Sequence, residues 1–283
     1  NVYKSLACRK PVAARIAKRY AHIYRNKGSK TPSKSDTKTH SNNPRKTFED
    51  LKYRKLTPEL MDDPNVDEAT LQAALAEVTR VNKYLGGQQV TLEGLGYFFY
   101  RFPQKSFTIL DVGCGDGAML RSIANFARRS SISVTLIGID INPKSIALAI
   151  ERSQDFPELS FQVQDVFKLK DTHQEIDIIT STLTMHHFTN TEILKFLEQF
   201  LTLANLGVVI NDLQRSKIAY RLFQAYSSLF MRSAMARHDG LISIERAFTK
   251  NDLLSFTAKL GVQSFNIKWR WAFRYLWILE NQK

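Results

Sequence analysis

Residues 109–120 read "ILDVGCGDGAML", which places an apolar strand directly before a glycine-rich loop and a helix-forming run. Gly113, Gly115 and Gly117 alternate with other residues in this loop. Glycine permits backbone conformations and close approaches that a side chain would prevent. The loop is therefore either a tight turn or a place where a ligand touches the main chain.

Apolar strands and helices alternate on either side of this loop. The pattern predicts strands at 107–112, 133–139, 159–164, 175–180, 206–211, 262–269 and 273–280. It predicts helices at 91–101, 117–128, 143–153, 190–203 and 249–260, and a long helical segment at 214–235. This alternation indicates βαβ units and a parallel sheet covered on both faces, and the short last connection indicates an antiparallel pair. We expect an α/β fold with a doubly wound, Rossmann-like, seven-stranded and mostly parallel sheet that has a terminal antiparallel strand.

Three acidic residues follow or end successive strands. Asp111 lies just ahead of the loop, and Asp140 and Asp165 end the second and third predicted strands. Ligands of such sheets bind at the carboxyl ends of the strands, where a carboxylate can accept both hydroxyls of a ribose. The G-x-G-x-G spacing differs from the G-x-G-x-x-G of dinucleotide-binding proteins. Each acid alone could be a helix N-cap or a turn residue, but the three together favour a nucleoside site.

This constellation resembles the class I S-adenosylmethionine-dependent methyltransferases over roughly residues 106–283. The resemblance implies S-adenosylmethionine as cofactor. It implies that the glycine loop holds the methionine part, that Asp140 binds the ribose and that Asp165 faces the adenine, while "STLTMHHF" forms the floor near the reactive methyl group. The implied cofactor contacts are Asp111, Gly113, Cys114, Gly115, Gly117, Asp140, Ile141, Asp165, Val166 and Thr182.

A methyl acceptor that reacts through oxygen or acidic carbon needs a base, and histidine is the usual candidate. We predict that His187, after the fourth strand, or His238, in "MARHDG", serves this purpose, and that His186 is structural. Each could instead be a histidine packed at a helix start. Cysteines occur only at positions 8 and 114, in no metal-ligand spacing, so no metal ion is expected.

The fourth strand allows several acceptor classes to be discounted. "ITSTLTMHHF" contains neither the Asn/Asp-Pro-Pro-aromatic signature of amino-methylating enzymes nor the metal-binding acids of catechol-type enzymes. The stretches "ELMDDPNVD", "VNKYLGG" and "ARHDGLISIERAFT" look like methyltransferases found beside type III polyketide synthases, which act on phenolic lipids and pyrones. We therefore expect metal-independent methylation, through oxygen, of a phenolic, pyrone or quinone-like small molecule.

The formal net charge of +13 is concentrated at one end of the chain. Residues 1–48 hold 13 of the 40 basic residues and one acid, which leaves 27 basic and 26 acidic residues in the remainder. A nearly neutral body argues against a dedicated RNA surface. The tail could be a targeting segment, a contact for nucleic acid or acidic lipid, or an unstructured extension. The alternative function is thus an RNA methyltransferase anchored by its basic tail.

The expected organisation has three parts: a basic, largely disordered tail at 1–48, a helical cap at 49–105, and a methyltransferase domain at 106–283. Within that domain, an apolar helical segment at 214–245 is expected as a lid over an acceptor pocket, or as a helix packed on the sheet. No apolar run approaches the roughly 18 residues that a membrane span needs. Two distant cysteines suit a reducing compartment, so we expect a cytoplasmic protein.

Overall fold

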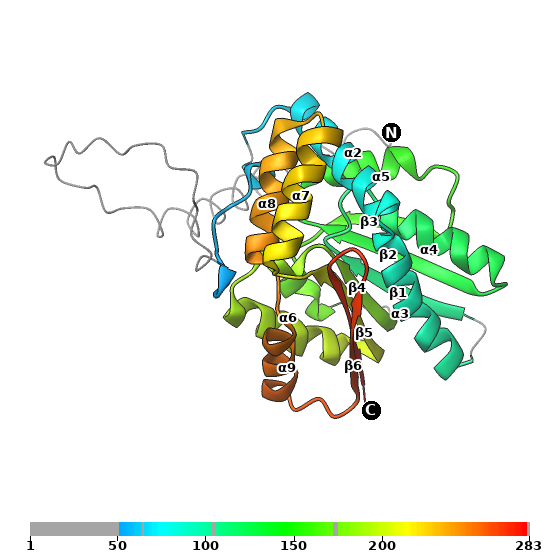
Figure 1. The fold of residues 1–283 in the computed structure, drawn as a ribbon. Helices are drawn as coiled ribbons and strands as arrows, with labels where there is room; N and C mark the ends of the chain where they lie inside the picture. Colours follow the sequence, from blue (N-terminus) through cyan, green and yellow to red (C-terminus); the bar gives the residue numbers. More distant parts are fainter. Residues whose placement is uncertain (1–50, 64, 104–105, 172–174, 282–283) are drawn as a thin grey trace, which may run out of the picture. The chain divides into compact units, whose positions relative to one another are not determined.

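The computed structural model describes residues 51–63, 65–103, 106–171 and 175–281. Within these residues, seven strands form one sheet in the order β3-β2-β1-β4-β5-β7-β6 (Figure 1). The strands are β1 (Ser106–Val112), β2 (Ser133–Asp140), β3 (Leu159–Val163), β4 (Ile176–Thr182), β5 (Ala204–Leu213), β6 (Phe265–Arg270) and β7 (Arg274–Glu280). The first five are parallel, and β7 runs antiparallel to both β5 and β6. The predicted fold class is confirmed.

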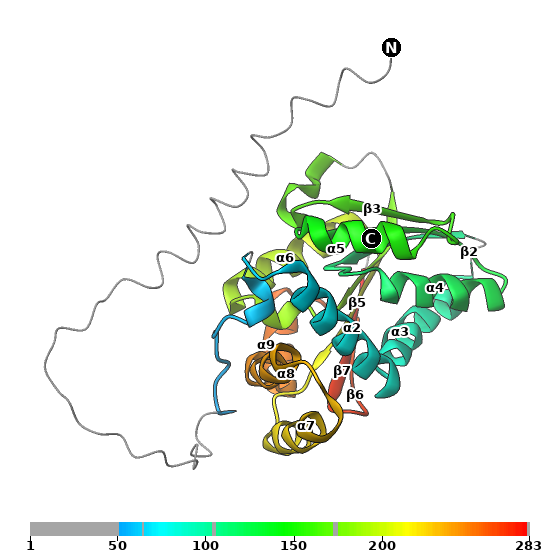
Figure 2. The same cartoon turned by 90° about the horizontal axis from the view of Figure 1, so that it is seen from above.

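Helices cover both faces of the sheet. They are α2 (Glu68–Tyr84), α3 (Gly87–Arg101), α4 (Ala118–Arg129), α5 (Pro143–Arg152), α6 (Asn190–Leu203), α7 (Lys217–Phe230), α8 (Ala234–Arg246) and α9 (Lys250–Lys259). Buried residues of α3, α4 and α5 pack on one face, and those of α6 and α9 pack on the other. Figure 2 shows α7 and α8 almost end-on, lying side by side.

The central strands β1 and β5 contain runs of consecutive apolar residues because both faces of the sheet are buried there. Ile109 and Leu110 are neighbours in β1 and are essentially fully buried, yet they belong to cores on opposite sides of the sheet. In β5, the neighbours Val208 and Val209 are likewise buried in cores on opposite sides of the sheet. This is the pattern expected of a parallel sheet between two helical layers.

Side-chain caps fix where the helices after the strands begin. Asn142 accepts a hydrogen bond from the amide of Lys144 (2.9 Å), with Pro143 at the first position of α5. Thr189 and Glu192 form a capping box at the start of α6. Such caps typically contribute about 1 kcal/mol each. They hold the loops at the carboxyl edge of the sheet in place.

The expected single helical segment at 214–235 is wrong, because two helices form there. Ser216 and Ser233 cap the starts of α7 and α8. Between them, the buried carboxylate of Glu77 in α2 accepts the amides of Arg232 and Ser233, both at 2.8 Å. These hydrogen bonds end the first helix and begin the second. The predicted base candidate His238 therefore lies inside α8 and not after a helix.

A second difference concerns the helix expected at 91–101. It begins at Gly87, because Gly86 has a left-handed backbone (φ 72°) that lets α2 end and α3 start almost at once. A β-carbon on Gly87 would collide with Asn82 and Arg274. Gly86 thus separates the two helices, and Gly87 is the first residue of α3.

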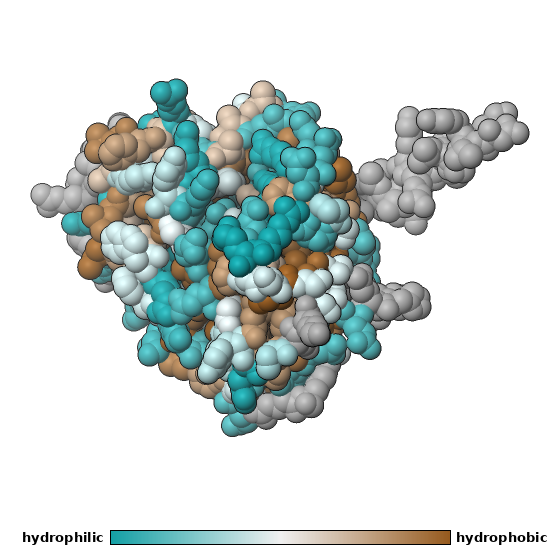
Figure 3. Space-filling view, turned by 90° about the vertical axis from the view of Figure 1, so that its right-hand side faces the viewer, coloured by the Kyte–Doolittle hydropathy of each residue, from teal (hydrophilic) through white to brown (hydrophobic). Residues whose placement is uncertain are grey.

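Some apolar residues of α7 are exposed to solvent, and others pack against α8. Ile218, Leu222, Leu229 and Phe230 are exposed. Phe223 packs against α8, where a β-carbon on Gly240 would lie 2.3 Å from its ring. On the face drawn in Figure 3, hydrophobic patches are separated by hydrophilic side chains.

Two further expectations concern the tail and membrane-spanning segments. The predicted tail at 1–48 lies outside the described residues. Among the helices that are described, none is both long enough and apolar enough to cross a membrane.

Candidate active site

The loop between β1 and α4 has a backbone that suits glycine. Gly113, Gly115 and Gly117 have φ values of 75°, 53° and 74°, a region that strains other residues. The Gly113 amide donates to the carbonyl oxygen of Ile139 at the end of β2 (2.9 Å). A β-carbon on Gly113 would lie 2.5 Å from the side chain of Thr184, after β4. The loop thus packs closely between the ends of β2 and β4.

Asp111 is a buried carboxyl group near the end of β1. It is 2% exposed, and Thr180 Oγ1 donates a hydrogen bond to its Oδ1 (2.7 Å). Burial, together with the nearby charge of Asp140, raises the pKa of Asp111 to about 7, although the hydrogen bond from Thr180 acts in the opposite direction. A cation next to this carboxyl would favour its ionised form.

Asp140 ends β2 and touches the glycine loop directly. Its Oδ2 accepts the amide of Gly115 (3.0 Å), and its Oδ1 accepts the amide of Asn142 (2.8 Å). Each carboxylate oxygen has a further lone pair for a ligand hydroxyl. Burial raises the pKa of Asp140, and the charge of His187 opposes this effect. Asp140 and His187 therefore lie close enough to influence each other.

Asp165 follows β3, and its carboxylate is used in the next turn. Its Oδ1 accepts the amide of Phe167 (3.1 Å), which is the turn role left open by the sequence. Val166 beside it is buried, and Ile141 beyond β2 is half-buried. The structure places all three at the carboxyl ends of β2 and β3.

Two further predicted cofactor residues lie toward the middle of the sheet. Thr182 ends β4, and its hydroxyl is 2.9 Å from that of Thr91 in α3. Cys114 is buried in the glycine loop, and burial raises the pKa of its thiol well above the ordinary value. A protonated, buried thiol is a poor nucleophile and metal ligand.

The two adjacent histidines after β4 have different surroundings. His186 has a 2% exposed side chain, and its Nδ1 lies 2.7 Å from Asp212 Oδ1. Burial would lower the pKa of His186, but Asp212, and after it Glu59, outweigh burial and raise that pKa to about 9. His187 has a 26% exposed side chain, and its Nδ1 lies 3.4 Å from Asp62 Oδ2. Of the two rings, only that of His187 is accessible to a ligand.

His238 is more exposed than either of these histidines. Its Nδ1 lies 2.9 Å from Asp239 Oδ1, and half of its side chain is accessible. The buried carboxylate of Asp239 accepts the amides of Leu60 and Met61 (2.8 and 2.9 Å). Both base candidates therefore lie next to the short segment 57–62.

No role was predicted from the sequence for Glu59 and Asp62 in that segment. Glu59 is 4% exposed, and its Oε1 and Oε2 lie 3.5 and 3.8 Å from Nε2 of His186 and of His187 respectively. Glu59, His186 and His187 place one ligand-type atom each within 4.8 Å of one another, so they could also hold a metal ion. The acidic stretch was visible in the sequence, but not its partners.

The cofactor loop and the histidine pair thus lie at one edge of a doubly wound sheet. The sequence pattern of the Methyltransferase domain family matches residues 103–251, just over half of the chain, and the chain belongs to that family. Residues 103–251 therefore form a methyltransferase domain, and their sheet has the strand order and terminal antiparallel strand expected for the class I S-adenosylmethionine-dependent enzymes.

Two curated relatives are similar to this chain. One is malonyl-[acyl-carrier protein] O-methyltransferase 1 of Ilyobacter polytropus, 25% identical over 54% of this chain and 52% of the relative. The other is a Bacillus subtilis protein, YxjB, whose name refers to 23S rRNA guanine-N1 methylation; it is 26% identical over 52% of this chain and 46% of the relative. The chain spans about half the length of the curated relatives it matches.

Solved structures share the fold. The plantazolicin methyltransferase BpumL, in complex with a pentazolic desmethylPZN analogue and SAH, is similar with a TM-score of 0.59 and 17% identity, over 78% of this chain and 93% of that one. Magnesium protoporphyrin IX methyltransferase from Synechocystis, with bound SAH, gives a TM-score of 0.50 and 15% identity, over 71% and 87% of the two chains. At these identities the likeness concerns the fold.

Proposed function

We propose that this methyltransferase transfers the methyl group of S-adenosylmethionine to an oxygen atom of a small apolar or aromatic acceptor, such as a phenolic, pyrone or quinone-like compound, without a metal ion. Asp111 and the glycine loop hold the methionine part, Asp140 binds the ribose, and Asp165, Ile141 and Val166 surround the adenine. His187 is the base, with His238 as the second candidate.

The observation that carries this proposal is the position of His187. It follows β4 directly, within electrostatic reach of Asp140, and its ring is partly open while its Nδ1 faces Asp62. Transfer from a sulfonium is a displacement with a neutral leaving group, so the protein mainly aligns the reactants. An acceptor hydroxyl must also lose a proton, and a histidine there can take it.

Two further points support an oxygen acceptor. The strand end that would hold an amino-methylating signature is Thr180-Ser181-Thr182-Leu183. The Ilyobacter relative is, by its name, an O-methyltransferase. The acceptor class itself rests on the resemblance to methyltransferases of phenolic lipids and pyrones.

The test is to incubate the protein with methyl-labelled S-adenosylmethionine and a panel of phenols, alkylpyrones and quinols. We expect one class to gain a single labelled methyl group on oxygen, detected by mass spectrometry. Fragmentation that places the label on nitrogen or ring carbon would contradict the proposal, as would the absence of any labelled product.

The second candidate function is methylation of RNA. The 13 basic residues in 1–48 and the similarity to YxjB favour it. Removing residues 1–48 separates the two functions. Small-molecule methylation should persist without the tail, whereas RNA binding driven by the tail should be lost together with its dependence on salt.

The raised pKa of Asp111 predicts a pH dependence of cofactor binding. If the cofactor ammonium group requires an ionised Asp111, binding below pH 7 must release a proton, while binding above pH 8 need not. With an Asp111 pKa of about 7 in the free protein, affinity for S-adenosylmethionine should rise about tenfold from pH 6 to pH 8 and then level off. Calorimetry across this range measures both the affinity and the proton release.

Asp111→Asn is the matched control, because it keeps the shape and cannot titrate. We expect weaker binding in this variant with no rise between pH 6 and pH 8. An equally steep rise in the variant would show that another group is responsible.

A further inference from the structure

Two carboxylates from residues 57–62 face the histidine pair after β4. Glu59 directs one oxygen at each ring, with Oε1 3.5 Å from His186 Nε2 and Oε2 3.8 Å from His187 Nε2. Asp62 Oδ2 lies 3.4 Å from His187 Nδ1. The His187 ring thus lies between two carboxylates, one at each nitrogen.

The helix α8 holds this segment in position. Asp239 accepts the amides of Leu60 and Met61 (2.8 and 2.9 Å). Arg246 donates to the carbonyl oxygen of Thr57 (2.7 Å). These hydrogen bonds hold the backbone of residues 57–62 on both sides of Glu59, so α8 determines where the Glu59 side chain lies.

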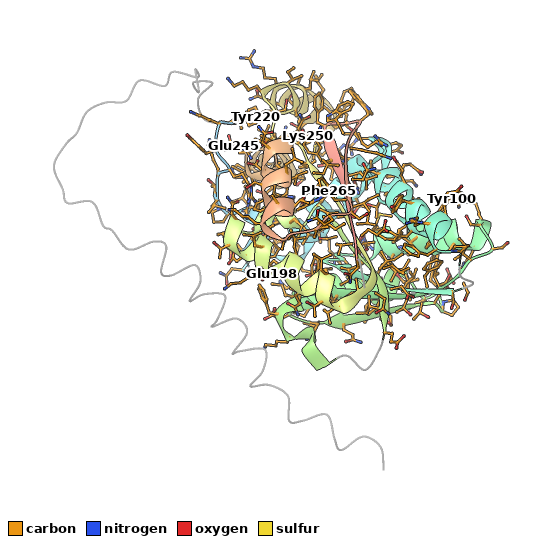
Figure 4. The ribbon with its side chains drawn as sticks, turned by 90° about the horizontal axis from the view of Figure 1, so that it is seen from below. Tyr100, Glu198, Tyr220, Glu245, Lys250 and Phe265 are labelled. Carbon is orange, nitrogen blue, oxygen red and sulfur yellow. The ribbon has the colours of Figure 1, made fainter. Side chains whose placement is uncertain are left out.

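The Glu59 side chain is itself anchored. Ser243 Oγ donates to Glu59 Oε1 (2.8 Å). Upstream, the amide of Lys55 donates to the carbonyl oxygen of Glu245 (3.2 Å), and the two side chains form an ion pair at 3.1 Å; Figure 4 labels Glu245. A side chain held this way orients its neighbours at little entropic cost.

Both carboxylates are ionised at neutral pH. Burial would raise the pKa of Glu59, but the charge of His187 and the hydrogen bond and charge of His186 outweigh it and hold that pKa below the ordinary value. The pKa of Asp62 is lowered in the same way, against burial, by His187 and then Arg246. Asp212 and Asp140 also interact with the charge of His187.

We propose that Glu59 and Asp62 are positioning residues for His187. Asp62 keeps the proton on Nδ1, which leaves the lone pair of Nε2 to take the proton of the acceptor, and Glu59 stabilises the ring once it is charged. A carboxylate serves a histidine base in this way in the serine hydrolases. This inference rests on the proposed O-methylation.

The step balances in atoms and charge. The acceptor oxygen forms a bond to the methyl carbon while the carbon–sulfur bond breaks, and the electron pair of that bond stays on sulfur to give S-adenosylhomocysteine. The acceptor proton moves to His187 Nε2. The positive charge of the sulfonium is therefore replaced by that of an imidazolium, which lies between the carboxylates of Glu59 and Asp62.

The same groups could instead bind a divalent cation, since Glu59, His186 and His187 converge within 4.8 Å. The geometry favours proton transfer by the histidines over the binding of a metal ion. Each of the four ring nitrogens already faces a carboxylate. The two rings also lie beside one another, 4.4 Å apart at their centres and tilted by only 34°, so each Nε2 faces a different oxygen of Glu59.

The test compares Glu59→Gln and Asp62→Asn with Asp63→Asn. Asp63 is the next residue along the chain, is exposed, and accepts the amide of Asn65, so its variant removes the same charge without touching the histidines. We measure the pH titration of the His187 ring by NMR in the cofactor-bound protein, the pH profile of kcat, and the affinity for S-adenosylmethionine.

In Glu59→Gln and Asp62→Asn, we expect the titration midpoint of His187 to fall by about one pH unit or more, because an opposite charge has been removed. The acid limb of the kcat profile should shift by the same amount, and kcat should fall at least about tenfold. Cofactor affinity should be unchanged, and Asp63→Asn should match the wild type in every respect.

Three outcomes would overturn the inference. The first is an unmoved His187 titration in both variants, and the second is a loss of kcat with an unshifted pH profile, which would indicate a purely structural role. The third is tight zinc binding to the wild type that disappears in Glu59→Gln. Because the NMR titration needs no acceptor, the two proposals fail differently: a moved titration without any methylated product would contradict the proposed O-methylation, whereas an unmoved titration beside a methylated product would overturn only the positioning role.

Discussion

Replacing Asp140 by alanine is expected to weaken the binding of S-adenosylmethionine at least tenfold. In the proposed site its carboxylate accepts the ribose hydroxyls, and loss of a hydrogen bond to a charged group costs about 1.5–3 kcal/mol, or about 10- to 150-fold in affinity. Asp140 also holds the amides of Gly115 and Asn142. Its removal therefore loosens the glycine loop as well, and isothermal titration calorimetry measures the combined loss.

Two variants separate these contributions. Asp140→Asn keeps one oxygen acceptor of similar shape and removes the charge, so its affinity should lie between those of the wild type and the alanine variant. Asp155→Ala removes an exposed acid in the turn between α5 and β3 and should bind as the wild type does. Unchanged affinity in Asp140→Ala would remove this residue from the cofactor site.

The sheet could be predicted from the sequence because each strand and helix is indicated by residues that are close together in the chain. The central parallel strands contain short apolar runs, and the alternation of strands with helices leaves few topologies. The segment after β5 was harder. The break between α7 and α8 depends on Glu77, a residue more than 150 positions away in the chain that accepts two amides at the break, and no local pattern encodes that contact.

The candidate cofactor site could be located from the sequence for the same reason. Its acids stand at the ends of successive strands, so the predicted topology alone brings Asp111 and Asp140 to one rim, where their charges interact. The detailed role of Asp165 could not be predicted, because a carboxylate after a strand can serve either a ligand or the next turn. Here one of its oxygens accepts the amide of Phe167.

The acceptor side could be predicted only in part. The histidines after β4 stand out in the sequence, but their partners come from distant segments: Asp62 is separated from His187 by 125 positions. The acidic run that contains Glu59 and Asp62 looks like a solvated helix start. Its charges become significant only once α8 binds the segment and brings it to the histidine pair.

The largest effect on turnover is expected from His187→Asn. If His187 is the base, kcat should fall by about 10²–10⁴-fold, the usual contribution of general acid–base catalysis. The affinity for S-adenosylmethionine should stay close to that of the wild type, because none of the residues proposed to bind the cofactor is changed. Steady-state kinetics with the best acceptor, together with calorimetry, tests both statements.

His238→Asn is the comparison that distinguishes the two base candidates. The His238 ring pairs with Asp239 and is half exposed, so we expect a clearly smaller loss of kcat than in His187→Asn. The opposite ranking would transfer the role of base to His238. Both variants must retain the wild-type melting temperature for the comparison to hold.

Alkaline pH provides the decisive control for His187→Asn. A phenolic acceptor loses its own proton in solution near pH 10, and an acceptor that is already ionised needs no base. The activity of His187→Asn should therefore recover steadily as the pH rises toward that value, while the wild type should gain little. A variant that is inactive because its active site is distorted would not recover, because alkali restores the charge of the acceptor and not the alignment of the reactants.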